Sequence, residues 1–107
     1  MAFYLLQVAY TTEAWAALVK NPQNRIEAVR PSIERLGGRV QGAWFAFGEY
    51  DIVAIFEMPN NVAQAAIAIA FAAGGAVKTL KTTPLMTIEE GIEAMKKAGG
   101  TGYKPPG

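Results

Sequence analysis

The segment from Tyr50 to Met58, YDIVAIFEM, has apolar side chains on both alternations of a predicted β-strand. Ile52, Ala54 and Phe56 fall on one alternation, and Val53 and Ile55 fall on the other. Because successive side chains of a strand point to opposite faces of the sheet, both faces of this strand need an apolar cover. One layer of helices covers only one face. The pattern therefore predicts a second covering surface.

The predicted elements follow the order strand, helix, strand, strand, helix, strand and final helix. Predicted strands cover Phe3 to Tyr10, Arg39 to Phe47, Tyr50 to Met58 and Val77 to Met86. Predicted helices begin after Thr11, run from Ile26 to Leu36 and from Val62 to Ala73, and begin again after the T-x-x-E capping box of Thr87 and Glu90. Pro31 either kinks or splits the second of these helices.

This order predicts an α+β fold of the ferredoxin-like βαββαβ type, with an additional C-terminal helix. Right-handed crossovers place both main helices on one face of a four-stranded antiparallel sheet. We expect one domain over residues 1–98 and a flexible tail over residues 99–107, GGTGYKPPG. We also expect a homodimer or larger homo-oligomer, in which a second copy covers the open apolar face of the sheet.

The composition excludes several kinds of chemistry. The 107 residues include no cysteine and no histidine, so disulfides, thiolate nucleophiles, sulfur-ligated metals and histidine catalysis are absent. We expect no cofactor and no metal, and the carboxylates Glu89, Glu90 and Glu93 are interpreted as a solvated helix face.

A net charge of +1 without a basic stripe argues against nucleic acid as a partner. We see no secretory signal and no membrane span, and therefore expect a soluble, cytoplasmic protein.

The sequence GEYD, which begins at Gly48, has two interpretations. Gly48 and Glu49 suit a two-residue type II′ hairpin turn, since glycine takes a positive φ at low cost. Asp51 then accepts hydrogen bonds near the start of the strand. Alternatively, Tyr50 and Asp51 line a binding site as donor and acceptor. One carboxylate is not a catalytic constellation, so the architectural interpretation is favoured.

Four further residues are candidates for ligand binding. Arg25, Lys78 and Lys81 could together hold an anionic molecule. However, the two lysines lie three residues apart and face opposite ways on a regular strand, so they converge only if the strand has a bulge. Gln7 is the single polar residue in the first strand and needs a partner, which could be a ligand or an ordered water.

The aromatic side chains have a structural interpretation as well. Trp15, Trp44, Phe45, Phe47 and Phe56 could line a ligand cavity, but aromatic residues on predicted strands and helix stripes more often belong to the core. We therefore expect these five side chains to be buried.

The segment GEYDIVAIFEMP, the Ala-rich helix after it and the segment GGAVKTLKTTPLMTIEE together resemble the GYD-domain family, which is grouped with the dimeric α+β barrels. The resemblance extends to about Ala98 and includes NPQNRIEAVRPSIERLGG. It implies this fold and dimerisation but no settled activity. Pro31 and the Lys-containing segment VKTLKTTPL depart from the family pattern, which puts a site on that strand in doubt.

Three functions stay open. The first is a module that binds a small molecule, either anionic or uncharged, or an accessory or regulatory subunit. The second is a cofactor-independent monooxygenase or isomerase, as the resemblance to dimeric α+β barrels implies, with Gln7, Arg25, Tyr50 and Asp51 as its parts. The third is a purely structural assembly unit.

Overall fold

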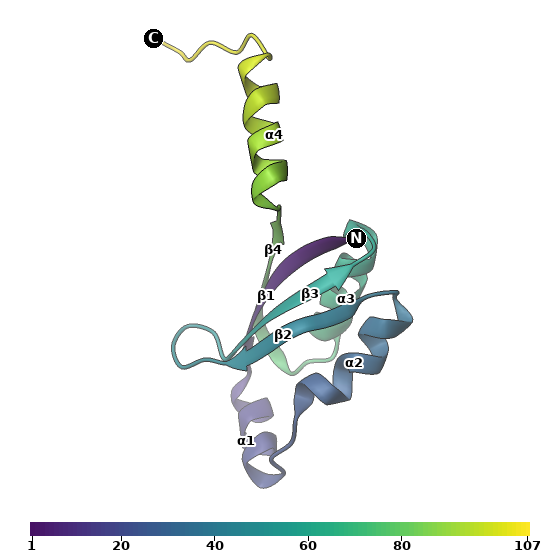
Figure 1. Ribbon diagram of the computed structural model, residues 1–107. Helices are drawn as coiled ribbons and strands as arrows, with labels where there is room; N and C mark the ends of the chain where they lie inside the picture. Colours follow the sequence, from purple (N-terminus) through teal and green to yellow (C-terminus); the bar gives the residue numbers. More distant parts are fainter.

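The structure, a computed structural model, describes residues 1–107. The strands are β1 (Ala2–Tyr10), β2 (Arg39–Phe45), β3 (Ile52–Met58) and β4 (Val77–Leu85), and the helices are α1 (Thr12–Lys20), α2 (Arg25–Arg35), α3 (Asn61–Ala73) and α4 (Ile88–Gly99). The strands form one antiparallel sheet in the order β2-β3-β1-β4 (Figure 1). The predicted α+β, ferredoxin-like fold is confirmed.

One face of the sheet holds the hydrophobic core. Alternate residues of β1 and β3 meet Ile33 of α2 and Ile67 of α3, and most of these side chains are almost completely buried. The members of this cluster are Tyr4, Leu6, Val8, Ile33, Ile52, Ala54, Phe56, Met58 and Ile67. The opposite face, which we call the open face, has no helix on it and includes Leu5, paired with Ile55, and Gln7, paired with Val53.

The two main helices begin at asparagine caps. The Asn24 side chain accepts a hydrogen bond from the Glu27 amide at 3.1 Å, and Asn60 accepts one from the Ala63 amide at 2.9 Å. Pro31 does not split its helix: α2 runs unbroken from Arg25 to Arg35, and Pro31 lies on its exposed side. Both helices therefore remain long enough to cover the sheet.

The connection between β2 and β3 is longer than predicted. β2 ends at Phe45 and β3 begins at Ile52, so the two-residue turn at Gly48 and Glu49 was a wrong prediction. Gly48 does take a positive φ of 155°. The Ala46 amide donates to the Asp51 carbonyl at 2.8 Å and closes the hairpin, so residues 47–50 form its loop. The Asp51 amide donates in the other direction, to the Val8 carbonyl of β1 at 2.8 Å. Asp51 thus joins the start of β3 to β1.

The expectation that the aromatic residues form the core is correct only in part. Phe56 is 1% exposed, whereas Trp44, Phe45 and Phe47 are 59%, 60% and 104% exposed. Trp44 and Phe45 end the edge strand β2, and Phe47 lies in the protruding loop after it (Figure 1). Strand composition predicted burial, but an edge strand and its loop have neighbours on fewer sides.

Helix α4 projects away from the rest of the molecule as a continuation of β4 (Figure 1). Its predicted capping box is confirmed, with Thr87 and Glu90 exchanging hydrogen bonds of 2.9 and 3.0 Å. Glu89 and Glu90 occupy its first turn, and Glu93 pairs with Lys97 at 3.5 Å. No helix of the chain has both the length and the apolar character needed to cross a membrane.

Candidate functional site

A pocket of about 240 Å³ lies on the covered side of the sheet, between α2 and α3 and above β1 and β3. Of the 14 residues that line it, 12 are hydrophobic, so the pocket suits an apolar group. The lining residues are Leu6, Val8, Tyr10, Arg25, Ile26, Val29, Ile52, Ala54, Phe56, Ala70, Phe71, Gly74, Ala76 and Val77. The small residues Ala54, Ala70, Gly74 and Ala76 leave the space that larger side chains would fill.

Arg25 brings the only formal charge to this pocket. It is the first residue of α2, and its Nη1 donates to the Gln23 side-chain oxygen at 2.9 Å. Arg25 forms no ion pair with a carboxylate of the chain, unlike Arg30 and Arg39. A guanidinium that borders an apolar pocket and has no anionic partner in the chain can bind the anionic group of a ligand.

Tyr10 is the second lining residue that carries a polar side-chain group, its hydroxyl. Burial raises the pKa of Tyr10, the nearby positive charge of Arg25 acts in the opposite direction, and the charge of Asp51 adds to the rise. The Tyr10 hydroxyl therefore stays protonated at neutral pH and can donate a hydrogen bond. The Tyr10 ring meets Trp15 edge to face, with ring centroids 5.4 Å apart.

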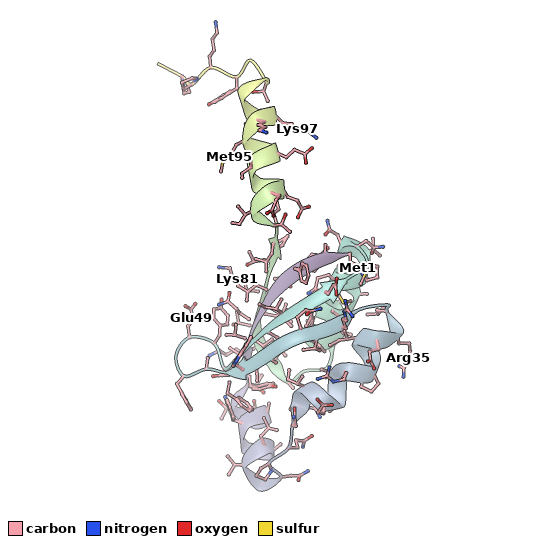
Figure 2. All side chains as sticks on the ribbon, in the orientation of Figure 1. Met1, Arg35, Glu49, Lys81, Met95 and Lys97 are labelled. Atoms are coloured by element: carbon pink, nitrogen blue, oxygen red, sulfur yellow. The ribbon has the colours of Figure 1, made fainter.

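Asp51 has a structural role in this arrangement. Its Oδ2 accepts hydrogen bonds from the Tyr10 amide at 2.9 Å and from the Trp15 indole at 3.2 Å. Asp51 therefore ties the end of β1 and helix α1 to the start of β3. Glu49, by contrast, is exposed on the loop and points away from the body (Figure 2).

Gln7 and Lys81 lie beside each other on the open face, not at the pocket. They are opposite residues in the pairing of β1 with β4, and Gln7 also faces Val53 of β3. Gln7 is half-buried and Lys81 is exposed (Figure 2). Gln7 and Arg25 thus lie on opposite sides of the sheet, and the structure does not gather the four residues of the enzyme hypothesis at one site.

Lys78 lies at an irregularity of β4. Ala9 pairs with Thr79 whereas Tyr10 pairs with Val77, which leaves Lys78 as the extra residue of a bulge. The simple alternation expected between Lys78 and Lys81 therefore does not hold. Tyr50 is half-buried in the loop before β3, and neither Tyr50 nor Lys78 lines the pocket.

Sequence reasoning named Arg25 but missed Tyr10 and the pocket itself. A tyrosine at the end of an apolar strand is ordinarily a core residue, so its type carries no signal of a site. The available clue was the closeness in sequence of Tyr10 and Trp15, two aromatic residues on either side of the strand end.

A second feature that sequence reasoning missed is Gln64. This side chain is 2% exposed on α3, and both its Nε2 and its Oε1 lack a hydrogen-bond partner. Thr82 of β4 likewise has a buried hydroxyl without a partner. The cap of α3 is Asn60, whose side chain accepts from the Ala63 amide, so the Gln64 side chain has no part in it.

The fold and the pocket define a ferredoxin-like α+β domain with an apolar pocket between its helices and its sheet. The model of the GYD domain matches residues 4–95, and the chain belongs to the GYD-domain family. This match includes the pocket residues and most of α4.

Comparison with curated proteins finds no match. Among solved structures, the chain is similar to the crystal structure of FFRP-DM1, with a TM-score of 0.50 and 14% sequence identity. The similarity covers 80% of this chain and 100% of that one. At this level of identity the comparison supports the ferredoxin-like fold alone.

Proposed function

We propose that this protein binds a small, largely apolar anion in the pocket between α2 and α3. The observation that carries the proposal is the pocket itself, which is lined mainly by hydrophobic residues and bordered by one arginine without an ion pair. Its volume of about 240 Å³ is slightly below the roughly 300–1,000 Å³ usual for drug-sized ligands, which favours a compact molecule.

The two polar groups of the pocket favour a carboxylate. Arg25 supplies a guanidinium whose paired N–H groups match the two oxygens of a carboxylate. The Tyr10 hydroxyl, kept protonated by burial, is a further donor. A single-ring carboxylate would place its ring among the apolar lining and its charge at Arg25, and benzoate is the simplest probe of this class.

The binding test compares benzoate with its uncharged analogue benzamide by calorimetry and by amide chemical shifts. We expect benzoate to bind the pocket at least tenfold more tightly than benzamide. Arg25→Gln should remove this difference, whereas Arg35→Gln, an exposed position on the same helix, should keep it. If benzamide binds as tightly as benzoate, the anionic part of the proposal is wrong.

A second pair of variants tests the pocket itself. Ala70 lines the pocket and Ala65 does not, although both are exposed residues of α3. Ala70→Leu should therefore abolish binding of both probes and Ala65→Leu should leave it unchanged. Native mass spectrometry of gently purified protein gives an independent result, since a retained ligand adds a discrete mass. Binding that survives Ala70→Leu would move the site elsewhere.

We also propose that the protein acts as a homodimer whose open faces pack against each other. Leu5, Val53 and Ile55 are apolar and only half-buried there, in register across β1 and β3. An apolar face of this kind favours association with a complementary surface, and two copies related by a two-fold axis provide one. The Gln7 side chain would then lie inside the dimer.

Sedimentation tests the dimer. The unmodified chain should sediment as a dimer at micromolar concentration, and Val53→Asp should shift it to a monomer. Ala28→Asp, which adds the same charge on the exposed side of α2, should leave the dimer intact. A clean monomer for the unmodified chain at micromolar concentration overturns this part of the proposal.

A further inference from the structure

Helix α4 carries an apolar stripe, although no residue of the helix is buried. Ile88, Ile92 and Met95 are spaced four and three residues apart, which places them on one side of the helix. They are 77%, 46% and 72% exposed. Figure 2 shows Met95 and Lys97 well away from the rest of the molecule. We call these three residues the α4 stripe.

A helix of this length needs a partner to be stable in water. Isolated helices shorter than about 12–15 residues are marginal, because nucleation costs more than a few hydrogen bonds return. The capping box at Thr87 and the acidic first turn help, but each such feature contributes only about 1 kcal/mol. Local interactions alone thus leave the 12 residues of α4 poorly stabilised.

The rest of the chain is not placed to cover the stripe. Only Met86 and Thr87 separate β4 from α4, and Thr87 is the helix cap, so the direction of the strand sets the direction of the helix. Figure 1 shows α4 leading away from the sheet along β4. The cover must therefore come from another molecule.

The overall dimensions agree with a missing partner. The radius of gyration is 17.2 Å, against about 13 Å for a compact domain of this length. The chain exposes 7420 Å², which is about 1,600 Å² more than a compact monomer of its mass. A standard interface buries about 800 Å² of each partner, so this excess is enough for a large, stable dimer.

The apolar surface is continuous from the sheet to the helix. Phe3 and Leu85 are paired neighbours on the open face and are 37% and 38% exposed. Met86, which is 66% exposed, follows Leu85 directly and leads to Ile88. A partner that covers the open face is therefore also in reach of the α4 stripe.

We infer that α4 is an intermolecular arm, which packs its apolar stripe on a second copy of this chain at the edge of that copy's open face. The inference rests on the proposed homodimer and adds a contact to it. Charge favours the same partner, since Lys81 is exposed on the open face without an ion pair and Glu89 lies in the first turn of α4. In a two-fold dimer each copy gives one arm and receives one.

The lack of native cysteine allows the contact to be observed directly. ¹⁵N-labelled chain is mixed with unlabelled Lys81→Cys carrying a nitroxide, so that any broadening of α4 signals comes from the other copy. We expect broadening of Ile88 to Met95 amides in this mixture. A nitroxide at Glu34→Cys, exposed on the helix side, should leave these amides sharp. Equal broadening from both labels, or none from Lys81→Cys, overturns the arm.

Two adjacent substitutions measure what the arm contributes. Ile92→Gln removes the centre of the stripe and Glu93→Gln changes an exposed neighbour outside it. Loss of one buried isoleucine from each arm should weaken the dimer at least tenfold, and Glu93→Gln should change the dissociation constant less than threefold. An unchanged dissociation constant for Ile92→Gln overturns the arm and leaves the sheet dimer standing.

Hydrogen exchange separates failure of the arm from failure of the dimer. The α4 amides should be protected at dimer concentrations and lose this protection on dilution. Protection that persists in a monomer means that α4 folds back on its own chain, which overturns the arm. A chain that is monomeric at every concentration overturns both the arm and the proposed homodimer, whereas pocket binding is measured independently.

Discussion

The two faces of β3 carry similar side chains but have different surroundings. Ile52, Ala54 and Phe56 are 5%, 0% and 1% exposed beneath α2 and α3, whereas Val53 and Ile55 between them are only half-buried. Both sets are apolar, so composition does not distinguish the face that the chain covers from the face that it leaves open. The difference shows that an apolar alternation predicts a strand face that packs against another surface. The topology of the fold determines which element, if any, packs there.

Two helices repeat this contrast. α3 is apolar over most of its surface and docks on β3 and β4, and its Ile67 is buried in the core. α4 has a well-defined apolar stripe with charged residues around it, yet no residue of it is buried. A regular stripe therefore predicts that a helix has a docking side, without predicting that the docking surface belongs to the same chain.

The largest expected effect comes from adjacent residues on opposite faces of β3. Phe56→Ala should lower the free energy of unfolding by about 3–5 kcal/mol, because it empties a closely packed site in the core. Ile55→Ala should lower the free energy of unfolding clearly less when the chain is monomeric, since its side chain is only half-buried. Urea denaturation of dilute protein measures both. Equal losses would mean that the two faces are covered to the same extent within one chain.

The next largest loss of stability is expected at Asp51, directly before the start of β3. Asp51→Ala should lower the free energy of unfolding by about 1–3 kcal/mol, because the Tyr10 amide and the Trp15 indole both lose their acceptor. Glu49→Ala, two residues away in the loop, should change it by less than about 0.5 kcal/mol. Thermal denaturation of the two variants gives the comparison. If they behave alike, the hydrogen bonds of Asp51 do not contribute to stability.

A gain in the free energy of unfolding is expected at Gln64, whose buried amide atoms have no hydrogen-bond partner. Gln64→Leu should raise the free energy of unfolding by about 1 kcal/mol, because it replaces two buried polar atoms that lack partners. Gln23→Leu, at an exposed position, is the matched control. Denaturant titration measures both variants. A loss of stability in Gln64→Leu would indicate that ordered water satisfies the amide, and that the covered side is complete as it stands.

The smallest expected effect is a dependence of the free energy of unfolding on pH that comes from Tyr10. Burial raises the folded-state pKa of Tyr10 above its unfolded value of about 10. The resulting stabilisation is complete below about pH 10 and is lost as pH rises through the folded pKa, because the unfolded state releases the proton first.

Tyr10→Phe removes this titration and should flatten the loss of stability between about pH 10 and pH 12. Tyr103→Phe, in the exposed tail, should retain it. Unfolding followed by circular dichroism across this range distinguishes the two variants. A loss of stability that persists in Tyr10→Phe assigns the alkaline titration to other groups.

The order of elements and the positions of the helices were predictable because hydrophobic periodicity and capping residues act locally. The apolar strands, the cap of α4 at Thr87 and the end of α2 near Leu36 depend only on neighbours along the chain. The apolar pattern of β3 also established that one layer of helices would not cover the sheet.

Contacts between distant segments decided the rest. The connection between β2 and β3 is longer than the predicted turn. Asp51, which follows it, bonds to the Val8 carbonyl and the Tyr10 amide of β1, about forty residues away in sequence. The pocket forms at the interface between helix α3 and the sheet. It is bordered there by three small residues: Ala54 of β3, Ala70 of α3, and Gly74 at the end of α3. Small side chains leave a cavity only when the side chains packed opposite them do not fill the space. The hydrophobic periodicity of one segment does not show which side chains will pack opposite it.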